Sequence, residues 1–116
     1  MGEGRPGIST HVLDTERGEP ARGVPVTLYR SEERGESVAG RGTTDDDGRV
    51  REMAPDALRV GAYRLCFDIA TWALHSGRER PFFTELSVSV IISDPDRNYH
   101  VPLLLSPFSM TTYRGT

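Results

Sequence analysis

The chain contains 116 residues, 36% of them hydrophobic and 27% charged, and carries a formal net charge of -3 at neutral pH. This length suits one compact domain with its own apolar core, so we expect residues 1–116 to form a single domain. No apolar stretch approaches the roughly 20 residues that span a bilayer, and a membrane protein is therefore not expected. Acidic and basic residues are interspersed along the chain, which argues against a nucleic-acid partner.

Apolar and polar residues alternate in several short stretches, and this period of two predicts half-buried strands. In chain order, the expected extended segments are residues 8–14, 24–29, 63–67, 86–92 and 99–105. Turn-forming residues separate them, mainly in the polar, Gly-containing or Pro-containing stretches 16–20, 31–35, 45–48 and 94–98.

One segment follows a helical period instead. Asp68 is placed to cap a helix whose buried face carries Ile69, Trp72 and Ala73, and Gly77 is placed to end it. Strands at intervals of about ten residues, joined by turns, indicate a two-sheet antiparallel sandwich. The expected fold is therefore an all-β sandwich of seven or eight strands with one short α-helix.

The types of residue present exclude several chemistries, and the opening residues argue against secretion. Cys66 is the single cysteine, so an intrachain disulfide and a cysteine zinc cage are impossible. All 14 basic residues are arginines, which excludes a lysine Schiff base and a P-loop lysine. The opening residues, MGEGRPGIST, lack a secretory leader, so we expect a cytoplasmic protein whose residues 1–6 form a flexible tail.

Most residues that could carry chemistry favour a structural interpretation. The run Asp45-Asp46-Asp47-Gly48 lacks the alternation and distal glutamate of a calcium-binding EF-hand loop, so we expect an Asp-Gly hairpin turn and no metal site. Cys66 is expected to be an unreactive packed thiol, and Trp72, Phe82 and Phe83 are expected to anchor the core.

The three histidines differ in their settings. His75 lies near the end of the expected helix, where it is most simply a solvent-facing residue. His11 and His100 lie within expected strands, and a single imidazole in a strand has no specific chemical meaning. Taken singly, each is best explained as a hydrogen-bonded structural residue.

Five segments together change this interpretation. They are His-Val-Leu-Asp at 11–14 with Gly18 and Pro20-Ala21, Thr44 with Asp47-Gly48-Arg49, Pro81-Phe82-Phe83, YHVPLLLSPF at 99–108, and YRGT at 113–116. These segments resemble the family of 5-hydroxyisourate hydrolases, transthyretin-like enzymes of urate breakdown, over nearly the whole chain. The carboxyl-terminal apolar stretch that runs into Tyr-Arg-Gly-hydroxyl is the most specific part.

The resemblance implies a transthyretin-like fold and a set of functional residues. Those implied in catalysis are His11, Arg49, His100 and Thr116. Those implied in substrate binding are Arg49, Tyr113, Arg114, Gly115 and Thr116. It further implies a homotetramer with its sites at the interface between dimers, no metal or organic cofactor, and hydrolysis of 5-hydroxyisourate to 2-oxo-4-hydroxy-4-carboxy-5-ureidoimidazoline.

The chain departs from the family pattern at three places. Thr116 replaces the usual terminal serine, Asn98 precedes Tyr99-His100 where a histidine is common, and Ser109-Met110 replaces a common Gly-Tyr. The hydroxyl at the terminus and the second histidine, His100, are both kept.

The implied chemistry suits these residue types. Opening a cyclic amide with water requires a base, a group that stabilises the oxyanion and a proton for the leaving nitrogen. An imidazole with a pKa of about 6.5 serves as base and then as acid, and either His11 or His100 could do so, with His11 marginally preferred from the family pattern. Arg49 offers planar paired donors to a carbonyl-rich edge, and Arg114 would position the substrate or lock the tail.

Other functions remain open. A transthyretin-like carrier of a small aromatic ligand is the main alternative, although hormone carriers with this resemblance lack the histidine pair and the Tyr-Arg-Gly-Ser-type ending. A structural sandwich domain for adhesion would need no such cluster. Covalent serine catalysis is disfavoured because Ser106 lies before Pro107 and no Gly-x-Ser-x-Gly elbow is present.

Overall fold

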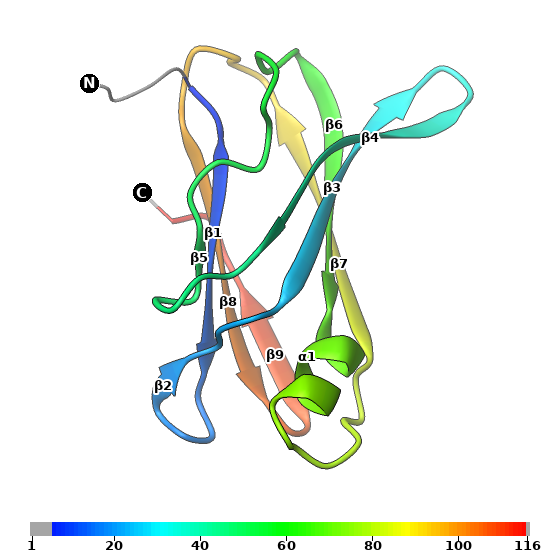
Figure 1. Cartoon of the computed structure of the whole chain (residues 1–116). Coiled ribbons are helices and arrows are strands. Elements are labelled where there is room, and N and C mark those ends of the chain that lie inside the picture. The colour runs from blue at the N-terminus through cyan, green and yellow to red at the C-terminus, as the bar shows by residue number, and fades with distance from the viewer. Residues whose placement is uncertain (1–5, 116) are drawn as a thin grey trace.

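Two β-sheets pack face to face, and a short helix lies at one end of the sandwich (Figure 1). The structure, a computed structural model, describes residues 6–115, so the terminal segment 1–5 of the expected tail and Thr116 lie outside the described residues. The elements are β1 (Ile8–Asp14), β2 (Glu19–Pro20), β3 (Pro25–Glu32), β4 (Gly35–Thr43), β5 (Arg49–Val50), β6 (Gly61–Asp68), α1 (Ile69–His75), β7 (Glu85–Ile92), β8 (Tyr99–Ser106) and β9 (Ser109–Thr112).

The sheet topology confirms the expected two-sheet sandwich and adds one feature to it. One sheet has the order β2-β1-β8-β9 with β5 also paired to β1, and the other has the order β4-β3-β6-β7. Every pair is antiparallel except β1 and β8, which run parallel. The two-residue strands β2 and β5 are too short to show a period in the sequence.

The core forms where the inward faces of the two sheets meet. On β1 the residues alternate between buried and half-buried, with Ile8 and Val12 fully buried. On β6 the same alternation buries Leu65 and Phe67. Burying such side chains stabilises the fold by roughly 1.5–3 kcal/mol each. The period of two thus places the remaining residues of each strand on the outer face.

The helix forms as its sequence predicts. Both carboxylate oxygens of Asp68 accept hydrogen bonds from Thr71, one from the backbone N–H at 3.0 Å and one from the hydroxyl at 2.7 Å. Gly77 follows the helix with a φ of 71°, a conformation that favours glycine. Of the three buried helix residues, Trp72 is the largest. No helix among residues 6–115 is long and apolar enough to cross a membrane.

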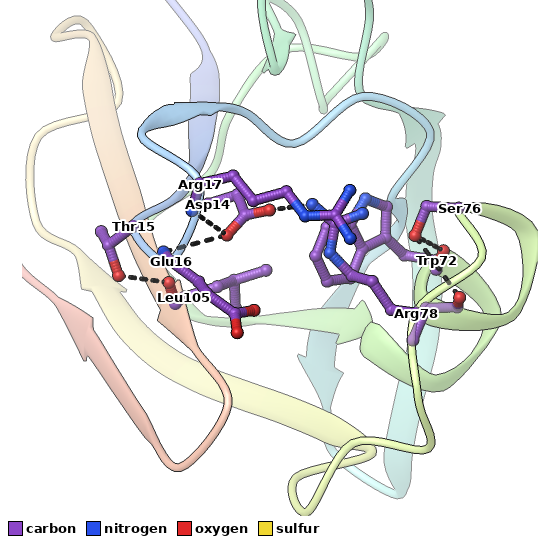
Figure 2. Close-up of polar contacts among 9 residues, drawn as sticks. Asp14, Thr15, Glu16, Arg17, Trp72, Ser76, Arg78 and Leu105 are labelled. Carbon is purple, nitrogen blue, oxygen red and sulfur yellow. Dashed lines mark hydrogen bonds and ion pairs between the residues drawn. The ribbon is translucent and has the colours of Figure 1, made fainter.

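A buried ion pair ties the segment after α1 to the end of β1 (Figure 2). Asp14 is 3% exposed, and its carboxylate pairs with the guanidinium of Arg78 and accepts backbone N–H bonds from Glu16 and Arg17. The Arg78 guanidinium also lies 4.3 Å from the centre of the Trp72 ring. These contacts fix the β1–β2 turn against the helix.

Two sequence-based expectations are wrong. Phe82 is 71% exposed and Phe83 is 36% exposed, so neither anchors the core. They lie in the loop between α1 and β7, where the period of two does not apply, and they contact each other edge to face. The Asp45–Gly48 turn is not a hairpin either, because it joins β4, which pairs with β3, to β5, which pairs with β1.

The Cys66 thiol is half-buried on β6 and donates a hydrogen bond to Glu85. Burial, followed by that contact, raises the pKa of the thiol. A protonated thiol is a poor nucleophile, which agrees with the expected unreactive residue.

Thr44 provides a test of this packing. Its buried hydroxyl donates to the Ala21 carbonyl at 2.7 Å and accepts from the Val24 N–H at 2.8 Å. Thr44→Val leaves both backbone groups without that partner, so we expect the free energy of unfolding to fall by about 2 to 4 kcal/mol in urea denaturation. The exposed neighbour gives the control, since Thr43→Val should change it by less than about 0.5 kcal/mol. Equal effects at the two positions would contradict the assignment.

Candidate active site

Strand β1 brings together residues from distant parts of the sequence. On one side it pairs with β5, which places His11 opposite Arg49. On the other side it pairs with β8 in parallel, which places Ser9 opposite His100. Of the residues predicted from sequence, His11, Arg49 and His100 therefore lie on three adjacent strands.

These side chains share the outer face of their sheet. Ile8, Thr10 and Val12 point into the core, so Ser9 and His11 face outward. On β8 the buried neighbours of His100 are Tyr99 and Val101, and on β5 it is Val50 that packs against the core. His100 and Arg49 consequently face outward as well.

The turn before β5 positions both Arg49 and His11. Asp45 accepts backbone N–H bonds from Asp47 and Arg49, each at 2.9 Å, and these donors, that of Arg49 first, lower the pKa of its carboxyl. Gly48 has a φ of 78°, and a Cβ there would lie 2.4 Å from the Val12 carbonyl oxygen, so glycine is required. The acidic run is thus a structural turn.

The same turn engages His11. Its Nε2 lies 2.9 Å from the Asp47 carbonyl oxygen. A carbonyl oxygen only accepts hydrogen bonds, so Nε2 of His11 carries a proton and donates it. Nε2 of His11 is therefore occupied by its hydrogen bond to the turn.

His100 is held from two sides. Its Nδ1 lies 2.9 Å from Ser9 Oγ, and its backbone carbonyl accepts the Gly115 N–H at 2.8 Å. A Cβ on Gly115 would lie 2.7 Å from Cδ2 of the imidazole, so the backbone of the carboxyl-terminal segment packs directly against the ring edge. Burial, then the nearby charges of Arg49 and His11, lower the pKa of His100 from its ordinary value of 6.5.

A cavity of about 780 Å³ opens over His100. Among the described residues, all of its charged lining side chains other than the imidazole are arginines, and none is a carboxylate. The lining residues are Ser9, Thr10, Arg49, Arg51, Arg97, Asn98, His100, Arg114 and Gly115. Such a cavity is large enough for a small ligand and favours one that carries negative charge or carbonyl oxygens.

The structure distributes the other predicted residues around this cavity. His11 lies beside Arg49 but does not line the cavity, and Tyr113 lines a separate, mostly apolar cavity of about 310 Å³. Arg114 borders both, and its guanidinium lies 5.0 Å from the centre of the Tyr99 ring. Thr116 lies outside the described residues.

Sequence reasoning assigned no site role to five lining residues, Ser9, Thr10, Arg51, Arg97 and Asn98. The strand period could have indicated Ser9, because residues two apart on a strand share a face and Ser9 lies two before His11. Arg97 lies in the turn between β7 and β8, where no period exists. Within residues 6–115 there is no group of three or more His, Cys, Asp or Glu residues that could hold a metal ion.

Comparison with known proteins gives consistent matches. Residues 8–115 match the model of the HIUase/Transthyretin family. The chain is 39% identical over 113 residues to 5-hydroxyisourate hydrolase of Caulobacter vibrioides, which covers 95% of this chain and 98% of that protein. The structure of Klebsiella pneumoniae 5-hydroxyisourate hydrolase superposes with a TM-score of 0.83 at 32% identity, covering 96% of this chain and 99% of that one. Sea bream transthyretin in complex with thyroxine superposes with a TM-score of 0.84 at 28% identity, covering 94% of each chain.

The chain therefore belongs to the HIUase/Transthyretin family. Its relatives in Salmonella, Caulobacter and Deinococcus, at 36–39% identity, are all 5-hydroxyisourate hydrolases. Within the family the chain is an enzyme of the hydrolase class.

The lowered pKa of His100 predicts a titration. Because burial and adjacent positive charge disfavour the imidazolium, the NMR midpoint of the His100 ring should lie below 6.5, and Arg49→Gln should raise it. The associated stability is full above 6.5, the unfolded value, and is lost as the pH falls through the lower folded value. A midpoint at or above 6.5 in the unaltered protein would contradict this account of the site.

Proposed function

We propose that this protein hydrolyses 5-hydroxyisourate to 2-oxo-4-hydroxy-4-carboxy-5-ureidoimidazoline. The observation that carries the proposal is the position of His100 beside Arg49 in a cavity lined by arginines. The relatives named 5-hydroxyisourate hydrolase, at 39% identity over most of the chain, support the same substrate.

In this proposal the arginines that line the cavity bind the substrate. The substrate is flat and carries several carbonyl groups, and a guanidinium presents two parallel donors to such an edge. Arg49 is the main anchor because it lies next to both histidines, and Arg114 and Gly115 border the same cavity. Tyr113 lines the neighbouring apolar cavity, and in this proposal it fixes the carboxyl-terminal segment that carries Arg114 and Gly115.

His100 is the proposed general base. Its Nδ1 contacts Ser9 and its Cδ2 edge contacts Gly115, which leaves Nε2 as the nitrogen available to the cavity. With its pKa lowered, the ring is neutral near pH 7 and takes a proton from the attacking water. The protonated ring then donates to the leaving ring nitrogen as the carbon–nitrogen bond breaks.

Arg49 and His11 complete the reaction. The guanidinium of Arg49 stabilises the oxyanion that forms when water attacks the carbonyl carbon. His11 holds the turn that carries Arg49 through its bond to Asp47, and this commitment of Nε2 favours His100 over His11 as the base. The side chains thus fill each required role, and we propose a reaction without metal or organic cofactor.

The role that we propose for Thr116 follows from the position of Gly115, the residue before it. Gly115, which precedes Thr116 in the sequence, is hydrogen-bonded to His100 and lines the cavity. We propose that the Thr116 hydroxyl orients the water or the imidazole. The family's usual serine offers the same hydroxyl, so a methyl group is the only chemical difference.

We also propose that the protein assembles as a homotetramer with its sites at the interface between dimers. An exposed aromatic patch supports assembly. It consists of Phe82, Phe83 and Phe108, the last in the turn between β8 and β9 and 78% exposed. Contiguous exposed aromatic residues are typical of protein interfaces. The cytoplasmic location expected from the sequence remains a prediction.

The activity test uses freshly generated 5-hydroxyisourate, whose ultraviolet absorbance should decay faster with the protein than in buffer. His100→Ala and Arg49→Ala should each slow the catalysed decay by about a hundred- to ten-thousandfold, because each removes a group that acts in the transition state. His75→Ala, at the exposed end of α1, is the matched control and should keep full activity.

Identical decay with protein and with buffer would refute the hydrolase proposal. Stoichiometric binding of an aromatic ligand without turnover would instead favour a carrier, as in the sea bream transthyretin complex with thyroxine.

The assembly test compares two exposed apolar residues of similar exposure. Phe82→Ser should lower the mass measured by sedimentation, because it removes part of the aromatic patch, whereas Leu74→Ser, which alters a helix residue that is 76% exposed, should not. A monomeric unaltered protein at micromolar concentration would contradict the proposed tetramer.

A further inference from the structure

The contact between Ser9 and His100 has a chemical consequence beyond holding the two strands together. The two residues are 91 apart in sequence, yet the parallel register of β1 and β8 places them opposite each other with Oγ and Nδ1 at 2.9 Å. Both side chains are half-buried and both line the cavity. The contact is thus built into the wall of the proposed active site.

A neutral imidazole carries its proton on one nitrogen only, and the partner of one nitrogen decides the state of the other. In water, histidine prefers the tautomer protonated at Nε2, which has no lone pair there and is useless as a base at that atom. A hydrogen-bond acceptor at Nδ1 reverses this preference. Ser9 Oγ lies at hydrogen-bond distance from that nitrogen, where its hydroxyl can either donate or accept. The backbone of Ser9 also hydrogen-bonds the ring and acts to raise its pKa, as an acceptor of a ring N–H does.

We propose that Ser9 is a positioning residue whose Oγ accepts the Nδ1–H of His100 and thereby keeps the Nε2 lone pair turned toward the cavity. This inference rests on the proposed function of His100 as the base. Ser9 itself touches neither the water nor the substrate in this account. Its effect on the reaction passes through the imidazole alone.

The surroundings of the ring support this orientation. Gly115 packs against the Cδ2 edge closely enough that a Cβ would collide with it, so the ring cannot turn freely about its Cβ–Cγ bond. Ser9 holds the Nδ1 side. Nε2 is then the one ring nitrogen not engaged by these two neighbours.

The charges around the ring explain why an uncharged acceptor suits this position. The titratable and charged groups that face His100 come from β1, β5, the β7–β8 turn and the tail: His11, Arg49, Arg51, Arg97 and Arg114. Of these, Arg49 and His11 lower the pKa of His100, after burial, and so disfavour the imidazolium. A carboxylate in place of Ser9 would add a negative charge that raises the pKa of the ring. A serine hydroxyl that accepts the Nδ1–H favours this tautomer without adding that charge, so the base stays unprotonated at neutral pH.

Nitrogen-15 NMR of the protein without substrate tests the proposal directly. At pH 7.5 the His100 Nε2 signal should have the shift of an unprotonated nitrogen and Nδ1 that of a protonated one. Ser9→Ala should move the population toward protonation at Nε2, and Ser9→Thr, which keeps the hydroxyl, should restore the original pattern. Ser89→Ala, on the outer face of β7 in the other sheet, is the matched control and should change nothing.

A kinetic experiment measures the consequence for the reaction. Ser9→Ala should lower kcat by about ten- to hundredfold, as loss of a partner that orients a functional histidine does elsewhere, with little change in KM. Ser9→Thr should recover most of the loss. An active enzyme in which Ser9→Ala leaves kcat unchanged would overturn the inference.

The two experiments separate this inference from the proposed function. Protonation at Nε2 in the unaltered protein, or a tautomer unaffected by Ser9→Ala, would overturn the positioning role even in an active hydrolase. Lack of activity toward 5-hydroxyisourate would defeat the proposed function, while the NMR result would still report whether Ser9 controls the His100 tautomer.

Discussion

The parallel pairing of β1 with β8 is the constraint on which the candidate site depends. It joins a strand from the start of the chain to one near its end, and it sets Ser9 beside His100 on the outer face of the sheet. Because side chains alternate between faces, a shift of register by one residue would turn Ser9 and His11 into the core. The inward residues Ile8, Thr10 and Val12, each fully buried, oppose such a shift. Core packing on one face therefore fixes the chemistry on the other.

Electrostatics gives the site its character. Arginines line the cavity around one imidazole, and burial together with the charges of Arg49 and His11 lowers the pKa of that imidazole. The same charge attracts carbonyl oxygens and the oxyanion that forms during hydrolysis. In the proposed mechanism, one arrangement thus keeps the base neutral and stabilises the transition state. The thyroxine-bound transthyretin of sea bream shares the fold, which shows that fold alone does not determine function in this family.

Much of the fold could be predicted from local patterns. The period of two identified β3, β6 and β7, and the cap at Asp68 with Gly77 behind it identified the helix. The parallel pair could not be predicted this way, because period two does not reveal which strands are neighbours. The exposure of Phe82 also escaped prediction, since residue type favours burial and only tertiary structure decides it for a loop.

The candidate site was predictable in part. Resemblance to a family indicated His11, Arg49 and His100, and the structure brings them onto adjacent strands. The family pattern marginally preferred His11 as the base, whereas we propose His100. That ranking depends on which ring nitrogen is engaged, and the Asp47 carbonyl at His11 Nε2 is a contact between residues 36 apart. Arg97 joins the cavity from a turn and carries no sequence signal.

We propose that His100, Arg49 and the carboxyl-terminal segment form one site that binds an oxidised purine on the outer face of this sheet. Titration with urate, a flat and carbonyl-rich stand-in for the substrate, followed by NMR of the histidine rings tests it without requiring turnover. The account predicts saturable shifts of the His100 ring, abolished by Arg49→Ala, with the His75 ring unmoved. Binding that leaves His100 unchanged, or that persists unaltered in Arg49→Ala, would contradict it.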